Sequence, residues 1–366
     1  MARRPETHAS NLEGRVLEGK KNGLLWTVGK KLEAKPTSGG TFSVCYPVTG
    51  KDQKKAFLKA TDVSLLTHGA GALDPLQRIH RATSEHLFER QILDLCNGNR
   101  MDKIVAALDY GELEFEIAGK SALVFYIIFE EAAGDVRSSA AQVGLETPAW
   151  FLTALHNVAV AVSQLHRTKI SHNDIKPSNV LVFDDLLQKL ADMGRATADD
   201  ISGPWDSVHC VGDYGYVPPE MWGYKFDPER VLNKITFKSR APCDIYLLGS
   251  LAYFFLTGEV LTPVMRGFLR PQHRPQNWNE DFEAVLPFLL TAHEHGMDSL
   301  KESIAHDWDK KYHKQLLELV PIISDLTCPD PRRRGDPKNK RRNASIYDLQ
   351  RIVSIFDRLS KQVSIR

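Results

Sequence analysis

Cysteine is scarce in this sequence, and none of it is arranged for metal or redox chemistry. The cysteines are odd in number and widely scattered, and no two of them form a C-x-x-C pair. This pattern argues against a zinc site and against a disulfide framework. Reduced thiols in an intracellular protein are therefore expected at Cys45, Cys96, Cys210, Cys243 and Cys328.

Long apolar runs are lacking as well. The most apolar segments, residues 122–129 and 245–256, are well short of the ~20 residues that a membrane-spanning helix requires. The first residues lead into a polar stretch without the apolar core of a secretory signal. We therefore expect a soluble, cytoplasmic protein without a membrane partner.

Neither sign of charge is in excess. Lys plus Arg number 47 and Asp plus Glu 46, so the overall balance favours neither a nucleic-acid nor a membrane partner. The basic stretch 332–342 is a local exception; a solvated loop is the simpler interpretation and a nucleic-acid patch the alternative. A hydrophobic share of 42% and a charged share of 25% are typical of globular proteins, and 366 residues suffice for two domains.

One polar stretch, residues 171–182, carries the strongest functional signal. With residues 192–194 it resembles the catalytic loop H-R-D-x-K-P-x-N and the metal-binding D-F-G of protein kinases. A polar surface turn closed by Lys-Pro is the alternative. Chance would produce the five loop identities on the order of 10⁻⁴ times in a chain of this length. Those identities are His172, Asp174, Lys176, Pro177 and Asn179.

The resemblance implies a role in phosphoryl transfer for each of these polar residues. Such catalysis rests on aligning the acceptor hydroxyl and neutralising charge on the γ-phosphate of ATP. Asp174 is then expected to orient the hydroxyl and accept its proton, and Lys176 to contact the γ-phosphate. Asn179 and Asp192 are expected to hold Mg²⁺, which prefers one or two carboxylate or carbonyl oxygens together with phosphate and water.

Two stretches nearer the N-terminus resemble the ATP-binding parts of the same family. Residues 38–43 resemble a degraded Gly-rich loop, in which Gly40 and Thr41 are the candidates for the ATP phosphates, although a plain hairpin turn fits as well. Residues 56–59 fit the strand motif V-A-x-K. Lys59 is therefore the candidate for the α- and β-phosphates, with a solvated strand lysine as the alternative.

A helix that begins at Asp74-Pro75 and ends at Asn97-Gly98 is predicted from its capping residues. By resemblance, Glu89 on this helix is expected to pair with Lys59. Glu85, one turn earlier, is the competing choice.

The domain organisation is also implied by the resemblance. An α+β, bilobal kinase-like fold is expected, with a small β-rich N-lobe and a larger, mainly α-helical C-lobe. The backbone near Glu130 and Ala132, in the hinge between the lobes, is expected to face adenine. Because the first residues are polar and aperiodic, we expect them to be loosely ordered. The expected parts are an N-terminal extension at 1–23, the N-lobe at 24–133 with an inserted loop at 61–73, and the C-lobe at 134–366.

Further matches lie in the C-terminal half. Glu220, in a stretch that resembles the G-T-x-x-Y-x-A-P-E end of the activation segment, is expected to pair with Arg334 of a D-P-x-x-R motif. Asp244 is expected to tie the backbone of the catalytic loop to a helix at 244–257. That helix is apolar all round and should be buried.

Four departures from the family pattern are visible. The Gly-rich loop is mostly lost, Asn173 replaces arginine, Met193 replaces phenylalanine and Asp213 replaces threonine. Methionine can fill an apolar position with a modest change in packing. Asp213 would place a second carboxylate near Asp174, so we expect it either to raise a pKa or to repel an acidic substrate.

We therefore expect an ATP- and Mg²⁺-dependent protein serine/threonine kinase with protein substrates. Lys176 within Asp-x-Lys-Pro-x-Asn is what the serine/threonine branch carries. A pseudokinase scaffold or nucleotide-binding module is one alternative, which the departures favour. A small-molecule phosphotransferase with a kinase-like fold is another, against which Lys176-Pro177, Pro219-Glu220 and Arg334 argue. The sequence does not predict the oligomeric state.

Overall fold

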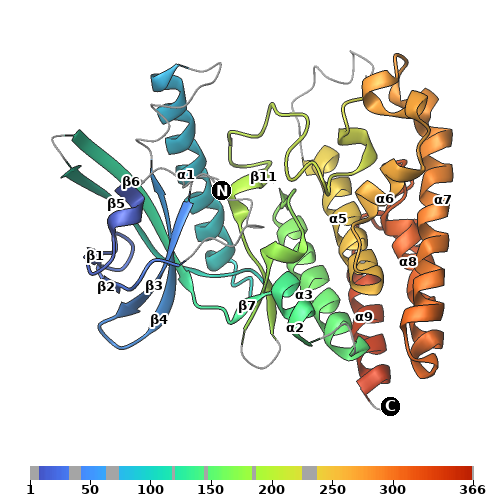
Figure 1. The fold of residues 1–366 in the computed structure, drawn as a ribbon, viewed down its shortest axis with the longest axis horizontal. Helices are drawn as coiled ribbons and strands as arrows, with labels where there is room; N and C mark the ends of the chain where they lie inside the picture. The colour runs from blue at the N-terminus through green and yellow to red at the C-terminus, as the bar shows by residue number, and fades with distance from the viewer. Residues whose placement is uncertain are drawn as a thin grey trace. The chain divides into compact units, whose positions relative to one another are not determined.

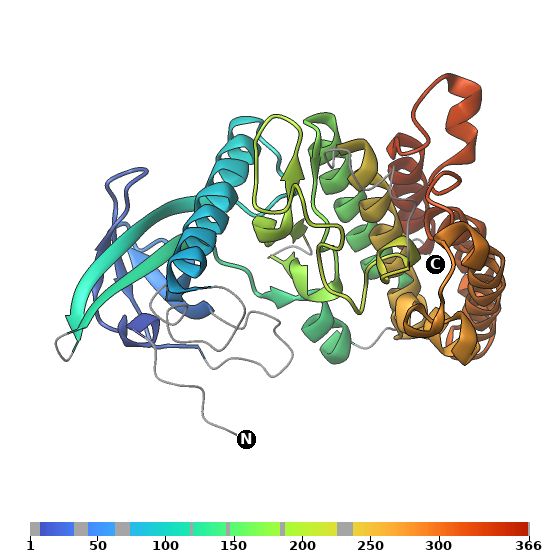
Figure 2. The same ribbon diagram turned by 90° about the horizontal axis from the view of Figure 1, so that it is seen from above.

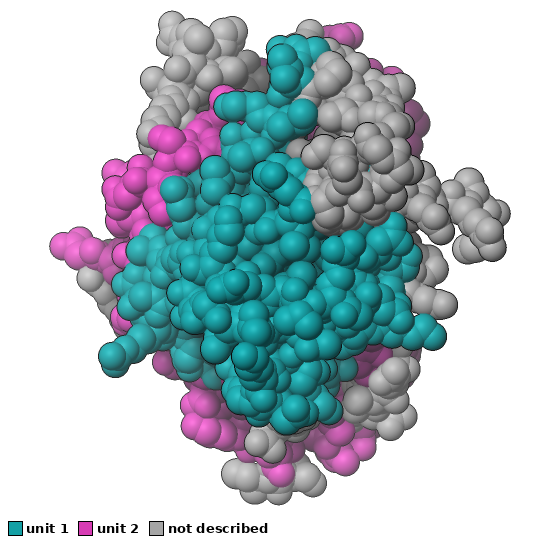
Figure 3. All heavy atoms as spheres, turned by 90° about the vertical axis from the view of Figure 1, so that its left-hand side faces the viewer, with its two compact units in different colours: residues 1–133 teal, residues 134–366 magenta. Residues whose placement is uncertain are grey.

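A computed structural model of the chain describes residues 8–32, 43–62, 74–117, 120–143, 147–183, 187–224 and 237–364. The chain forms two compact units, Met1–Ala133 and Gly134–Arg366, which are coloured separately in Figure 3. The first is rich in strands and the second is mainly helical (Figure 1). This order of a strand-rich and a helical unit confirms the α+β fold class.

A six-stranded antiparallel sheet forms the body of the first unit. Its strands alternate in burial, as in β4, where Ala56, Leu58 and Ala60 are fully buried and the residues between them are partly exposed. The buried face packs with Trp26 and Tyr46 into one apolar core. In spatial order the strands are β1 (Val16–Glu18), β2 (Leu25–Val28), β3 (Ser43–Gly50), β4 (Lys55–Asp62), β6 (Lys120–Glu130) and β5 (Ala107–Ile117).

Helix α1, Pro75–Gly98, begins and ends where its capping residues predict. The Asp74 side chain accepts from the Gln77 backbone N–H, and the Gln77 side chain accepts in return from the Asp74 N–H, which completes a capping box. The helix packs against β5, which with β6 forms a long hairpin beside it (Figure 2). This packing positions Glu89, which is 8% exposed.

Residues 8–23 are ordered, so the expectation of a loose extension up to about residue 23 is wrong for them. They contain η1, His8–Asn11, and the strand β1, which pairs antiparallel with β2. Leu17, at the centre of β1, is 1% exposed. A polar, aperiodic segment can therefore add a strand when one apolar side chain reaches the core.

The start of this segment is fixed by buried groups of the sheet. Asp62 is fully buried and accepts from the backbone N–H groups of His8 and Ala9 at 2.5 and 3.3 Å. The Tyr46 hydroxyl donates to the Ala9 carbonyl at 2.6 Å. Ala9 and Leu12 are themselves fully buried. Residues 8–12 are therefore part of the folded unit.

Helix α5, Phe237–Thr257, is the central helix of the second unit. From Arg240 to Tyr253 it is buried on all sides, as its composition predicts, and it begins seven residues before the expected Asp244. No single helix among the described residues is long and apolar enough to cross a membrane. Helices α5 and α6 (Leu261–Phe268) together have the length and composition of a membrane span, but the chain bends by 86° at the break between them.

The other helices of this unit pack around α5. Helix α3 contacts both α5 and α9, and α5 also contacts α7 and α8. The last helix, α9, begins at Gln350, where Asp348 accepts from the Gln350 N–H. The bounds are α2 Val136–Val143, α3 Pro148–Arg167, α6 Leu261–Phe268, α7 Phe282–Asp307, α8 His313–Leu326 and α9 Gln350–Ser364.

Short strands pair before α2 and within the segment that connects α3 to α5. The order β10-β9-β7 makes one small antiparallel sheet, and β11-β8 makes another. The catalytic-loop residues lie between β8 and β9. The bounds are β7 Gly134–Asp135, β8 Ile170–Ser171, β9 Val180–Val182, β10 Gln188–Leu190 and β11 Thr197–Ala198.

Candidate active site

The backbone of residues 172–173 is held by Asp244 on α5. Its two carboxylate oxygens accept from the N–H groups of His172 and Asn173 at 2.9 and 2.8 Å. Asp244 is fully buried, and the His166 ring lies 2.9 Å from the same carboxylate. The expected tie between the loop and the helix is therefore confirmed.

Asp174 and Asn179 converge within this loop. The Asn179 side-chain amide donates to the Asp174 carbonyl at 2.8 Å and to its carboxylate at 3.2 Å. Because the amide nitrogen is engaged in this way, the side-chain oxygen of Asn179 remains as an acceptor. The turn Pro177–Asn179 between them is a single 3₁₀ turn, which brings two residues five positions apart into contact.

Lys176 bridges two carboxylates. Its ammonium lies 3.1 Å from Asp174 Oδ2 and 3.3 Å from Asp213 Oδ2. Burial lowers the pKa of Lys176, but the carboxylates of Asp174 and Asp213 outweigh it and raise that pKa above its ordinary value. The side chains of Lys176 and Asp174 are 12% and 8% exposed, so their ion pair is largely removed from water, whereas Asp213 is 41% exposed.

The structure does not support the expectation that Asp213 raises the pKa of Asp174. The pKa of Asp174 is raised by burial, with a further contribution from the charge of Asp192, while Lys176 opposes the shift. Asp213 instead donates its backbone N–H to Asp174 Oδ1 at 3.1 Å and directs its carboxylate toward Lys176. Lys176 therefore neutralises the carboxylate that was expected to disturb Asp174.

Asp192 lies near Asp174 in a left-handed backbone conformation, with φ of 67°. Such a φ costs free energy for a residue other than glycine, and strain of this kind gathers at functional sites. Next to it, Met193 is fully buried, as expected for an apolar side chain that replaces phenylalanine. A carboxylate at Asp192 and an amide oxygen at Asn179 are the donor types that Mg²⁺ takes, so the residues present fit that ion.

In the first unit, Lys59 on β4 and Glu89 on α1 form an ion pair. Lys59 Nζ lies 3.4 Å from Glu89 Oε1, and the two side chains are 27% and 10% exposed. Glu85, the competing choice, accepts from Arg81 one turn earlier. The structure therefore brings Glu89, and not Glu85, to the strand lysine.

The remaining candidates for ATP divide into two groups. Glu130 ends β6 and Ala132 follows it directly, and the Glu130 side chain accepts from the Ala106 N–H at 2.7 Å. Gly40 and Thr41 lie outside the described residues, as does most of the inserted loop expected at residues 61–73.

The side chain of Asn173 connects the catalytic loop to the segment that follows Asp192. It is fully buried and donates to the Arg195 carbonyl at 3.0 Å and to the Thr197 hydroxyl at 3.2 Å. An arginine could not make these short contacts in the same space. Thr197 is 5% exposed and is therefore a poor target for modification.

Gly212 fits closely against the same loop. Its φ is +102°, and a Cβ atom at this position would lie 2.3 Å from the Asn173 carbonyl oxygen. Glycine is therefore required by both backbone conformation and space. The contact holds Asp213, the next residue, beside Asp174.

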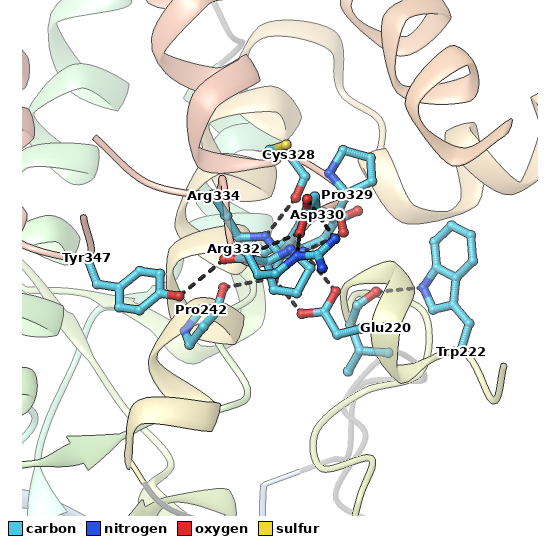
Figure 4. A network of polar contacts seen from close by, with 12 residues as sticks. Glu220, Trp222, Pro242, Cys328, Pro329, Asp330, Arg332, Arg334 and Tyr347 are labelled. Atoms are coloured by element: carbon cyan, nitrogen blue, oxygen red, sulfur yellow. Dashed lines mark hydrogen bonds and ion pairs between the residues drawn. The ribbon is translucent and has the colours of Figure 1, made fainter. Parts of the chain in front are cut away.

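Arg334 is fully buried and uses all five of its donors (Figure 4). It makes a bidentate pair with Glu220 at 2.5 and 2.8 Å, which confirms the pairing expected from the sequence. Its other contacts are with three backbone carbonyls, those of Cys328, Pro242 and Pro329. The pair anchors the end of the activation segment to α5 and to the loop before α9.

Two contacts within the second unit were not found by sequence reasoning. His166 lies in the last turn of α3 and contacts Asp244, but a single histidine at a helix end gives no signal of that role. Arg137 donates to the Tyr216 hydroxyl at 2.5 Å. These residues are far apart in sequence, so only the fold brings them together.

Comparison with known proteins agrees with this geometry. The profile of the protein kinase domain matches residues 40–335. The chain is 26% identical over 211 residues to a leucine-rich repeat receptor-like serine/threonine/tyrosine-protein kinase of Arabidopsis thaliana, covering 55% of this chain and 28% of that protein.

Two other relatives come from a bacterium and a plant. A probable serine/threonine-protein kinase of Corynebacterium glutamicum is 28% identical over 217 residues, which are 58% of this chain and 31% of that protein. A calcium and calcium/calmodulin-dependent serine/threonine-protein kinase of Medicago truncatula is 32% identical over 198 residues, which are 50% of this chain and 35% of that protein. The matched parts span about a third of these relatives. Because the profile covers most of the chain, the chain belongs to the protein kinase family.

Proposed function

We propose that the chain transfers the γ-phosphate of ATP, as its Mg²⁺ complex, to serine and threonine hydroxyls of protein substrates. One observation carries the proposal: the side chains of Lys176 and Asn179 both lie within hydrogen-bond distance of the Asp174 carboxylate. A carboxylate, an ammonium and an amide oxygen are the groups that phosphoryl transfer needs for the acceptor, the transferred phosphate and the metal.

Asp174 is the residue that orients the acceptor hydroxyl and takes up its proton. Burial and the neighbouring charge of Asp192 raise the pKa of Asp174, which makes its carboxylate a better proton acceptor. Lys176 neutralises negative charge on the phosphoryl group. Asn179 and Asp192 would hold Mg²⁺, which supplies further neutralisation of the phosphates when bound.

Lys59 binds the α- and β-phosphates, and Glu89 fixes its position through the ion pair at 3.4 Å. The backbone near Glu130 and Ala132 binds adenine, and Gly40 and Thr41 contact the phosphates. These roles rest on the family resemblance at each position.

The choice of serine and threonine over tyrosine rests on Lys176. It stands two residues after Asp174, as in the serine/threonine branch, and most of the relatives above carry serine/threonine in their names. A cytoplasmic location is part of the proposal and is supported by the five free cysteines.

The test is a transfer assay with radiolabelled ATP and three peptides that differ only in a Ser, Thr or Tyr acceptor. We expect label on the Ser and Thr peptides, and loss of labelling on chelation of Mg²⁺. Asp174→Asn should lower kcat by about 10³-fold. Asp298→Asn, an exposed change on α7 of equal charge, is the control and should have no effect.

Two results would contradict the proposal in different ways. Equal labelling of the Tyr peptide would remove the serine/threonine assignment. ATP binding without transfer to any peptide or to a mixed protein extract would favour the scaffold interpretation.

A further inference from the structure

The charges around Asp174 do not balance. Two carboxylates, those of Asp174 and Asp213, contact the single ammonium of Lys176. Among the described residues, Lys176 is the cation that forms an ion pair with Asp213. The region therefore keeps an excess of negative charge.

Asp213 is the most accessible side chain of the Asp213–Lys176–Asp174 cluster. It is 41% exposed, against 12% for Lys176 and 8% for Asp174. One of its oxygens accepts from the Gly215 N–H at 2.9 Å, and the other faces Lys176. Its backbone is fixed by the bond from its N–H to Asp174 Oδ1. Asp213 thus presents a fixed, partly exposed carboxylate beside the residue proposed to hold the acceptor hydroxyl.

The distance from this carboxylate to the acceptor is short. Asp174 Oδ2 and Asp213 Oδ2 both contact one ammonium, so they lie no more than about 6.5 Å apart. Successive Cα atoms of a peptide are about 3.8 Å apart, so Asp213 is within reach of the residue on either side of the acceptor. Under the proposed function Lys176 also serves the γ-phosphate, which leaves Asp213 less well neutralised when ATP is bound.

From this geometry we propose that Asp213 selects substrates with a lysine or arginine directly beside the acceptor serine or threonine. The inference rests on the proposed function for the position of the acceptor. A lysine or arginine beside the acceptor partly neutralises the Asp213 carboxylate while Lys176 is engaged with the phosphate. A glutamate in the same place adds a third carboxylate to the cluster and is disfavoured.

The experiment uses the full chain and matched peptides with Lys, Ala or Glu immediately before or after the acceptor. For at least one of the two positions we expect kcat/KM to be about tenfold higher for Lys than for Ala, and lower again for Glu. The Lys-to-Ala ratio should fall to about twofold or less in Asp213→Asn and in Asp213→Thr. Asp213→Asn retains an acceptor for the Gly215 N–H, so the two variants separate charge from local structure. Asp298→Asn, with the same change in net charge, should keep the wild-type ratio.

A second measurement separates this inference from the proposed function. Fluorescence anisotropy of the same peptides, with Ala in place of the acceptor, reports binding without transfer, and the same ranking is expected. Ranked binding without any transfer would overturn the proposed function and leave the role of Asp213 standing. Transfer at equal rates to all three peptides, or a ratio that survives both Asp213 variants, would overturn the role of Asp213.

Discussion

Replacing Arg334 by methionine should destabilise the helical unit strongly, whatever reaction the protein catalyses. The change removes all five hydrogen bonds of a fully buried guanidinium. It also leaves the Glu220 carboxylate, whose side chain is 13% exposed, without its cation. Loss of one partner of a buried pair costs about 3–5 kcal/mol. For a unit of this size that loss corresponds to a fall in Tm of roughly 10 °C.

The assay is urea unfolding followed by far-UV circular dichroism, with thermal melts as a second measure. The double variant Glu220→Leu/Arg334→Met removes the stranded charge, so it should be more stable than Arg334→Met alone. Arg358→Met is the matched control, because Arg358 and its partner Glu318 are 42% and 46% exposed and form a surface pair. A cost below about 1 kcal/mol for Arg334→Met, or strictly additive effects in the double variant, would refute the reasoning.

Three further changes test other parts of the structure. Gly212→Ala should lower kcat/KM at least about tenfold and reduce stability by about 1–3 kcal/mol, because its Cβ would clash with the Asn173 carbonyl oxygen. In the control Gly267→Ala the new Cβ has no neighbour within 4 Å, so kcat/KM and stability should not fall. Burial lowers the pKa of His293 to about 4, and the charge of Arg334 adds to the shift, so stability should fall as the pH drops from about 6.5 to 4. In urea titrations, His293→Gln should remove roughly 3 kcal/mol of that loss of stability. A variant with the same pH profile as wild type would contradict this prediction. The raised pKa of Asp174 means that the native state binds the Asp174 proton more tightly than the unfolded chain does, so stability falls as the pH rises above about 4. Asp174→Asn should therefore have a higher Tm than wild type at pH 7 but not below about pH 4. Equal Tm values at pH 7 would contradict this prediction.

The sequence predicted those parts of the site that depend on short spacings. Asp174 and Asn179 lie five residues apart in one loop, and a single 3₁₀ turn is enough to bring them together. The pairing of Glu220 with Arg334 spans 114 residues, and only the family motifs at both positions made it predictable. The caps of α1 were predictable because capping depends on residues three positions apart.

Other features could not be predicted because they depend on where a side chain turns. Asp213 was correctly placed near Asp174, but its carboxylate turns to Lys176, so the expected disturbance of the base does not arise from it. The ordering of residues 8–12 depends on Asp62 and Tyr46, which are 34 or more positions away. No local pattern in a polar segment reports such a partner.

The segment that precedes β3 has a consequence for how this protein can be shortened. The profile of the family begins at residue 40, but β1 and β2 lie before it and complete the sheet. A chain cut at residue 40 would turn β3 into an edge strand with unpaired backbone groups and would uncover Tyr46 and Val48. It would also leave the buried Asp62 without the N–H groups of residues 8 and 9. The residues that match the family are therefore fewer than those that the sheet needs to fold. A protein trimmed to residues 40–335 would tend to associate through the exposed edge of β3.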